Sequence, residues 1–250
     1  MISDRETNVS SLRIFGDEPF FVFCDHASNA IDDDLDCLGM PEDLLATHIA
    51  WDIGAGGITR AVGERLSCAT LNCKFSRLVV DANRAVEAPD VIPATSDQIP
   101  VPGNQMLDEA ARQARFARYH DPYHEELGAV IEALSAKHDN LFTISIHSFT
   151  DRMMGAADPR PWQAGMLWRH DETSARMLTK FLKSETDWQI GDNEPYDARV
   201  FNYSVDRHIA PKNLRHITLE LRQDVIFEER DRLAVADLLA RGLRHVTERL

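Results

Sequence analysis

The segment Leu141–Ser148 reads LFTISIHS, and the interpretation of the rest of the chain starts from it. Residues 141–146 form a short apolar run that contains β-branched side chains, which predicts a buried strand. His147 and Ser148 follow the run at once. Because ligands of open α/β sheets bind at the carboxyl ends of the strands, we expect these two side chains at a binding edge.

A second such strand is predicted at Phe20–Cys24, which reads FFVFC and leads directly into Asp25 and His26. Further strands are expected at 69–75, 78–80, 164–168 and 216–221, and helices at 41–66 (with a break near Gly54), 106–138 (divided at Pro122), 172–183 and 228–250. Strands that alternate with helices predict a mainly parallel sheet covered on both faces. The whole chain, residues 1–250, is therefore expected to form one three-layer α/β domain.

Two segments show neither a helix pattern nor a strand pattern. Residues 85–103 contain four prolines and are expected to form a loop, which is long enough to act as a lid. Residues 187–211 are also expected to be mostly loop.

The composition excludes several classes of function. The chain has 250 residues, of which 44% are hydrophobic, and its formal net charge is −14. A charge of this sign repels phosphate backbones, so nucleic acid is not expected as a partner. No apolar run approaches the roughly 20 residues that span a bilayer, and the polar N-terminal residues do not resemble a secretory signal. The four cysteines include no C-x-x-C pair and are expected to be reduced thiols in a cytoplasmic protein.

Polar residues follow or end four of the predicted strands. The sets are Asp25-His26-Ala27-Ser28-Asn29, Asp81-Ala82-Asn83-Arg84, His147-Ser148 and Glu220-Leu221-Arg222. One such set is weak evidence for a site. Four sets that reach the same edge of a sheet predict one.

His26 and His147 are the best candidates for metal ligands. Neutral imidazole suits zinc, and catalytic zinc usually has three protein ligands and a water. The third ligand is open among Asn29, Asp25 and Asp52. A lone histidine is more often a loop or capping residue, but two at separate strand ends favour a shared site.

Glu220 stands in an otherwise apolar strand. Burial raises the pKa of a carboxyl group and a nearby metal lowers it, so this side chain is a candidate for moving a proton at the site. Arg77 and Arg84 flank the predicted strand 78–80, and guanidinium groups bind carboxylates in a bidentate manner. An anionic small-molecule substrate would suit them, although surface arginines in solvated pairs are as common.

Other catalytic arrangements fit the sequence less well. There is no G-x-S-x-G elbow, and the GAGG stretch at 54–57 is too short for a phosphate loop. His120 and His124 have i, i+4 spacing but lack the H-E-x-x-H pattern. We interpret them as helix-surface or packing residues.

Five motifs, in order along residues 20–225, resemble those of the N-formylglutamate amidohydrolase family, which is related to zinc carboxypeptidases and succinylglutamate desuccinylases. They are FCDHASNAI (23–31), WDIGA (51–55), SRLVVDANR (76–84), SIHSFT (145–150) and LELRQD (219–224). The resemblance implies a phosphorylase/hydrolase-like fold of the zinc-peptidase type. It also implies metal-dependent hydrolysis of a small N-acyl amino acid, with N-formylglutamate as the first candidate, in amino-acid degradation such as histidine catabolism.

The resemblance also assigns roles to residues. His26, Asn29 and His147 would be the ligands of a divalent metal, with zinc expected first. Glu220 would be the general base and Arg77 would assist at the carbonyl, while Asn83, Arg84, Ser148 and Arg222 would contact the substrate. Asn29 departs from the pattern of the carboxypeptidases, which have a ligating Glu there. Another deacylase or peptidase of this fold, or an inactive small-molecule-binding relative, is therefore the alternative.

Overall fold

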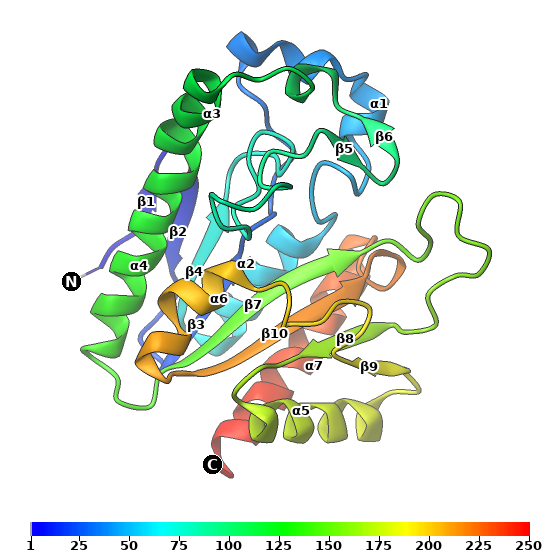
Figure 1. The fold of residues 1–250 in the computed structure, drawn as a ribbon. Helices are drawn as coiled ribbons and strands as arrows, with labels where there is room; N and C mark the ends of the chain where they lie inside the picture. The colour runs from blue at the N-terminus through cyan, green and yellow to red at the C-terminus, as the bar shows by residue number, and fades with distance from the viewer. Residues whose placement is uncertain (1) are drawn as a thin grey trace.

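The computed structural model describes residues 2–250, and the fold is a three-layer α/β domain around one large mixed sheet (Figure 1). The predicted domain of residues 1–250 is therefore described except for Met1. The sheet has eight strands in the order β1-β2-β4-β3-β7-β10-β8-β9. Their bounds are Arg5–Glu6 (β1), Ser10–Ile14 (β2), Phe20–Cys24 (β3), Ala69–Cys73 (β4), Phe142–Phe149 (β7), Ala164–Leu167 (β8), Ile190–Asp192 (β9) and Arg215–Arg222 (β10).

The centre of the sheet is parallel, as the sequence predicts. β4, β3, β7 and β10 are neighbours and run in the same direction. Antiparallel pairing occurs towards the edges, where β2 pairs with β4 and β8 pairs with β10. The carboxyl ends of the four central strands therefore meet at one edge, where an α/β sheet binds its ligands.

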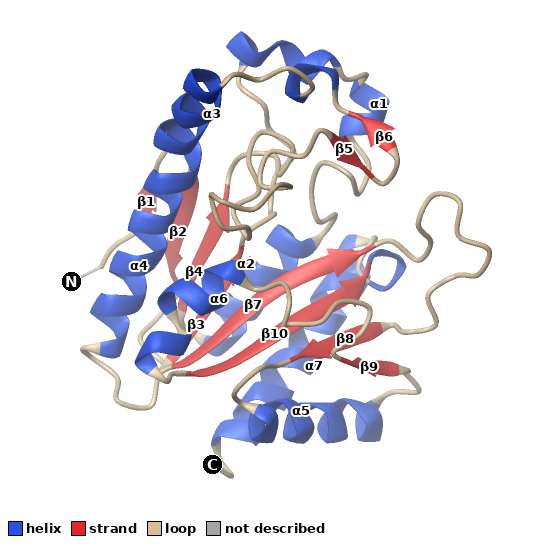
Figure 2. Ribbon diagram, viewed as in Figure 1, coloured by secondary structure: helices blue, strands red, loops and turns tan. Residues whose placement is uncertain are grey.

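Helices cover both faces of this sheet (Figure 2). The main helices are α2 (Ala55–Leu66), α3 (Glu109–Arg115), α4 (Asp121–Ser135), α5 (Glu172–Glu185), α6 (Tyr203–His208) and α7 (Glu229–Thr247). α2, α5 and α7 pack on one face, and α4 and α6 pack on the other. Shorter elements are α1 (Glu42–Leu45), the hairpin β5 (Thr95–Ser96) and β6 (Ile99–Pro100), a π-helical turn at Phe116–His120, and 3-10 turns at Asp33–Gly39, Pro102–Asn104, Ala210–Lys212 and Gln223–Val225.

The alternation of side chains along β3 explains why FFVFC forms a central strand. Phe21 and Phe23 point into the core beneath α4, whereas Phe20, Val22 and Cys24 point into the core beneath α2 and α7. All five are buried, because a strand in the middle of a three-layer fold has no exposed face. Burial of each large apolar side chain contributes about 1.5–3 kcal/mol.

The predicted helix 41–66 is wrong over its first half. α1 covers only residues 42–45, and irregular turns lead from it to α2. Gly54 has a φ of +83°, which ends any continuous helix and which residues with a Cβ rarely adopt. A Cβ at Gly56 would lie 2.9 Å from the Cβ of Ala27, so this glycine lets α2 approach the segment after β3 closely.

The predicted strand 78–80 is also wrong. Leu78, Val79 and Val80 are fully buried, but they lie in a series of turns after β4 rather than in the sheet. Their apolar character reflects burial in a loop that folds back over the core. An apolar run of three residues does not distinguish these two situations.

Several short elements lie where no element was predicted: β1, β2, β9 and α6. Pro122 lies in the first turn of α4, directly after the π-helical turn at Phe116–His120, so the predicted division of this helical segment corresponds to a π turn and not to a loop. All four cysteines are free. No helix within residues 2–250 has both the length and the apolar character needed to cross a membrane.

Candidate active site

A cavity of about 260 Å³ lies at the carboxyl ends of the central strands. The side chains that line it come from β7, β8 and β10, from the turns after β3 and β4, from the turn before α2, and from the segment between β9 and α6. They are His26, Asp52, Arg77, Asn83, Arg84, His147, Ser148, Leu167, Tyr196, Phe201, Asn202, Thr218 and Glu220. The cavity thus gathers most of the residues that the sequence motifs indicate.

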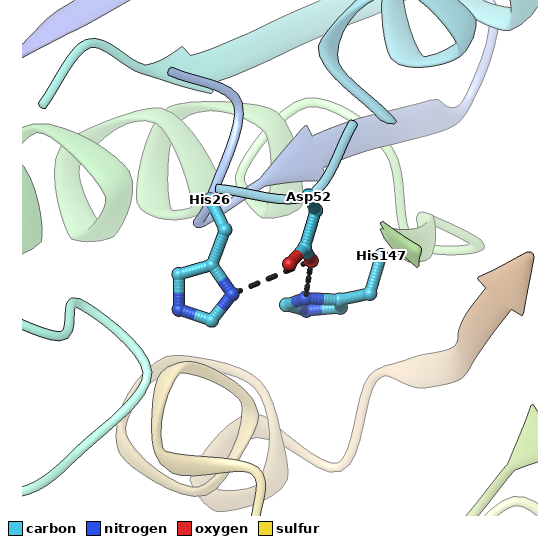
Figure 3. Close-up of side chains that lie close together, drawn as sticks. All are labelled: His26, Asp52 and His147. Carbon is cyan, nitrogen blue, oxygen red and sulfur yellow. Dashed lines mark hydrogen bonds and ion pairs between the residues drawn. The ribbon is translucent and has the colours of Figure 1, made fainter. Parts of the chain in front are cut away.

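His26, Asp52 and His147 form a buried group that can hold a metal ion. Each offers one ligand atom, and these atoms all lie within 4.8 Å of one another. Figure 3 shows the carboxylate of Asp52 between the two imidazole rings. Its Oδ2 lies 2.9 Å from Nδ1 of His147 and 3.4 Å from Nδ1 of His26. The three side chains are each no more than 5% exposed, so the group is shielded from bulk water.

Local backbone contacts bring Asp52 to this position. The amide of Asp52 donates to the carbonyl of His26 over 3.0 Å, which ties the turn before α2 to the end of β3. The backbone amide of Ser148 donates to Oδ2 of Asp52 over 3.3 Å, which ties the same turn to β7. Ser148 also donates from Oγ to the carbonyl of Ile53. Asp52 therefore joins two strands that are adjacent in the sheet.

Two further carboxylates face the outer nitrogens of the histidines. Nε2 of His26 donates to Oδ1 of Asp81 over 2.7 Å, and because an ionised carboxylate can only accept, this bond leaves Nδ1 without a proton in neutral His26. Nε2 of His147 lies 3.7 Å from Oδ2 of Asp25. Carboxylates of this kind orient metal-binding histidines and raise their basicity.

Electrostatic interactions within the group shift the pKa values of all three side chains. Burial alone would lower the pKa of His147, but the hydrogen bond and negative charge of Asp52 outweigh it and raise that pKa to about 9. The pKa of His26 is raised as well, because the charges of Asp81 and Asp52 outweigh burial and the repulsion of Arg77. Burial opposes ionisation of Asp52, yet the two histidines hold its pKa below the ordinary value. A carboxylate between two imidazoles is thus ionised and ready to bind a cation.

Glu220 lies beside this group on β10. It pairs with His147 of β7 in the register of the two strands, and it is 6% exposed. Its Oε2 is buried without a hydrogen-bond partner. Burial raises the pKa of its carboxyl group to about 7, against the opposing pull of His147. A carboxyl group with this pKa can accept and release a proton near neutral pH.

Arg77 lines the cavity but is held by two carboxylates. Its Nη2 donates to Oδ2 of Asp81 over 2.8 Å, and its Nη1 donates to Oδ1 of Asp52 over 3.4 Å. The side chain is 26% exposed. Arg77 therefore neutralises Asp81 behind His26 and Asp52 between the two histidines, and it still presents part of its guanidinium to the cavity.

Asn83 and Arg84 lie on the turn after β4, and buried histidines support this turn. Nε2 of His124 is bonded to the carbonyl of Ala82 over 2.9 Å, and Nε2 of His120 to the carbonyl of Arg84 over 3.0 Å. Burial lowers the pKa of His124 to about 2, so this residue is neutral. The interpretation of both histidines as surface or packing residues therefore misses their contact with the turn.

Two of the predicted site residues lie outside the cavity. The amide of Asn29 donates to the carbonyl of Leu45 over 2.9 Å, and the structure does not bring this residue together with the two histidines. Asp52, the alternative from the loop before α2, occupies that position. Arg222 does not line the cavity; its Nε pairs with Asp224 over 2.7 Å and its Nη1 donates to the carbonyl of Arg160.

Several residues that line the cavity lie outside the sequence motifs. Leu167 and Thr218 belong to strands β8 and β10, whereas Tyr196, Phe201 and Asn202 lie in the segment that was expected to be loop. Thr218 could have been found, since it shares a strand face with Glu220 at i and i+2. Tyr196, Phe201 and Asn202 reach the cavity from the segment before α6, which packs across the sheet beside α4, and no local pattern indicates this packing.

Comparisons with known proteins give matches to a sequence family and to solved structures. The family model described as N-formylglutamate amidohydrolase matches residues 18–227. A solved gene product of Agrobacterium tumefaciens is 27% identical, with a TM-score of 0.89, and the match covers 97% of this chain and 96% of that one. The N-formylglutamate amidohydrolase of Ralstonia eutropha JMP134 is 15% identical, with a TM-score of 0.75 and coverages of 97% and 98%, which shows a shared fold. A search of curated proteins found no match.

Proposed function

Because the chain belongs to the N-formylglutamate amidohydrolase family, we propose that it is a metal-dependent amidohydrolase of small N-acyl amino acids, with N-formylglutamate as the first substrate to test. The products would be formate and glutamate. The observation that carries the proposal is the group of His26, Asp52 and His147 within 4.8 Å of one another, in one cavity with Glu220.

The donor set of this group suits a divalent cation. Two imidazoles and one carboxylate are a common set for catalytic zinc. Nδ1 of His26, on the side that faces Asp52, is buried without a hydrogen-bond partner, as is expected of an atom arranged for a ligand. His26, Asp52 and His147 would hold the cation, with Asp81 and Asp25 behind the histidines. When bound, a divalent cation polarises a carbonyl oxygen and lowers the pKa of water.

Glu220 would move the proton of the reaction. In the proposed hydrolysis a water oxygen attacks the acyl carbon, and Oε2 of Glu220 accepts a proton from that water. The bond between the acyl carbon and nitrogen then breaks, and Glu220 donates the proton to the departing nitrogen. The absence of a hydrogen-bond partner for Oε2 supports this role, since nothing else competes for the proton.

The remaining polar residues of the cavity would orient the substrate. Arg84 would bind the carboxylate of the amino acid, with Asn83 and Ser148 as further contacts. The part of Arg77 that faces the cavity would stabilise negative charge on the carbonyl oxygen. Substrate binding by Arg222 is not supported by its place outside the cavity, where it pairs with Asp224.

The experiment that tests the proposal is an assay of formate release from N-formylglutamate, before and after the protein is treated with a chelator. We expect hydrolysis that disappears on chelation and returns with zinc, cobalt or manganese. A preference for N-acetyl or N-succinyl amino acids, or for peptides, would assign the chain to another deacylase or peptidase. Binding without hydrolysis would indicate an inactive relative. A cytoplasmic location and a place in histidine catabolism remain predictions from the sequence and the family.

A further inference from the structure

A second cavity, of about 660 Å³, adjoins the candidate active site. Four residues line both cavities and so form the wall between them: Asn83, Arg84, Phe201 and Asn202. Beyond this wall the second cavity extends between residues 85–90 and the start of α6. The proposed function does not use this space.

The wall depends on a contact between Arg84 and Phe201. The guanidinium carbon of Arg84 lies 4.6 Å from the centre of the Phe201 ring, and Nε of Arg84 lies 3.0 Å from a carboxylate oxygen of Asp90. Phe201 is 44% exposed and Val200 beside it is 67% exposed. Single exposed apolar residues are ordinary, but these two are adjacent in the chain and both line the second cavity.

The lining of the second cavity is apolar and acidic. Ala88, Pro89, Val200 and Phe201 contribute apolar surface. Asp90 and Asp206 contribute carboxylates, which pair with Arg84 and Arg169 respectively. Among the described residues that line this cavity, Arg84 is the one basic side chain. A substrate group that passes the wall therefore meets apolar atoms and negative charge.

The position of Arg84 determines which part of a substrate would reach the second cavity. If Arg84 holds the α-carboxylate at the wall, the scissile amide points towards Glu220 in the first cavity. The side chain of the same amino acid is then the group free to reach the second cavity. A long apolar side chain would gain surface burial there. The side-chain carboxylate of glutamate would instead stay in the first cavity, where Arg77 presents part of its guanidinium.

We propose, on the basis of the proposed function, that the second cavity is a side-chain subsite. The chain then hydrolyses N-acyl amino acids with long apolar side chains, of which N-formylphenylalanine is an example, in addition to N-formylglutamate. Burial of such a side chain improves binding by about ten- to a hundredfold.

The test compares kcat/KM for N-formylphenylalanine with that for N-formylalanine in the metal-loaded full chain. We expect a ratio of at least about ten in the native sequence. Val200→Asp places a charge in the subsite, and Ala88→Trp fills it. Both should bring the ratio close to one without a change in the hydrolysis of N-formylalanine. Leu233→Asp is the matched control, because Leu233 is an exposed residue of α7 that lines neither cavity, and it should keep the native ratio.

A kcat/KM ratio near one in the native sequence would contradict the proposed subsite. A ratio that Val200→Asp and Ala88→Trp leave unchanged would contradict it as well. Failure of the proposed function looks different, because no N-formyl amino acid would then be hydrolysed at all. In that case, calorimetric titration with the same two compounds gives the ratio of their binding affinities. Equal affinities, or a preference that persists in Val200→Asp, would again reject the subsite.

Discussion

Nδ1 of His147 lies 2.9 Å from Oδ2 of Asp52, although 95 residues separate them in the chain. This contact joins strand β7 to the irregular turn before α2, and the same carboxylate lies 3.4 Å from Nδ1 of His26. A segment that the sequence analysis treats as helical therefore supplies the acid at the centre of the candidate metal site. The predictions below depend on this arrangement.

Substitutions around the metal group should have graded effects on metal affinity. Asp52→Asn should abolish stoichiometric zinc binding, because it removes the charge between the two histidines. Asp81→Asn should weaken binding by about 10–100-fold, because Asp81 only orients His26. Asn29→Ala should bind zinc normally, since its amide is bonded to Leu45 outside the cavity. Calorimetric titration with zinc measures all three, and weakened binding in Asn29→Ala would restore this residue as a ligand.

Glu220→Gln should retain the metal and lose turnover. The amide has the shape of the acid but cannot accept a proton, so we expect kcat to fall by about 10²–10⁴-fold at unchanged zinc content. Glu172→Gln is a matched control, since Glu172 is an exposed residue on α5 that pairs with Arg176. Turnover in Glu220→Gln close to that of the control would remove Glu220 from its proposed role.

The pH dependence of the reaction should follow Glu220. The general base must be ionised, so kcat/KM should rise with pH and level off above the pKa of this group. In the metal-free protein that pKa is about 7, and a bound cation would lower it further. We therefore expect a rising limb with its midpoint at or below pH 7. A rate that falls as the pH increases from 5 to 7 would contradict the role of Glu220 as a base.

The same carboxyl group should destabilise the metal-free fold at alkaline pH. The folded-state pKa of Glu220 lies above its value of 4.5 in the unfolded chain, so the folded protein binds the proton more tightly. Stability is then lost as the pH rises from about 4.5 through 7, by on the order of 3 kcal/mol. Glu220→Gln avoids this loss, so its unfolding free energy should exceed that of the native sequence at pH 8 and not at pH 4. Denaturant titration at the two pH values measures this, and equal stabilities at pH 8 would contradict it.

Substitutions of Arg84 and of Arg222 should have different effects on catalysis, although the sequence predicts that both residues bind substrate. Arg84→Met should lower kcat/KM by about 10–100-fold, mainly through KM, because it removes a charged hydrogen-bond donor from the cavity. Arg222→Met should leave both constants nearly unchanged, since Arg222 pairs with Asp224 outside the cavity. Steady-state kinetics with N-formylglutamate distinguish the two, and equal losses would mean that Arg222 reaches the substrate.

Local patterns predict the centre of this fold well. FFVFC forms β3 with the predicted bounds, and LFTISI forms the first part of β7 except for Leu141, because a central strand buries both faces and shows this in its own sequence. The outer strands β1, β2 and β9 carry no such signal. β2 and β9 pair with strands that are distant in the chain, and β1 has only two residues, which pair with β2.

The site was predictable where its residues lie near the carboxyl ends of central strands. His26 follows β3, His147 and Glu220 lie close to the ends of β7 and β10, and the structure brings all three to one cavity. Asp52 could only be named as an alternative, because its position depends on the turn that Gly54 and Gly56 allow. Tyr196 and Phe201 could not be found at all, since their segment reaches the cavity through the packing of α6 against the sheet.

The central claim is that one cation bound by His26, Asp52 and His147 makes Glu220 an effective base. Titration of zinc into chelator-treated protein, with formate release from N-formylglutamate recorded at each addition, tests it most directly. Activity should rise in proportion to zinc and saturate at one ion per chain, and Asp52→Asn should show neither binding nor activity. Full activity before any zinc is added, or saturation of the site without formate release, would contradict the account.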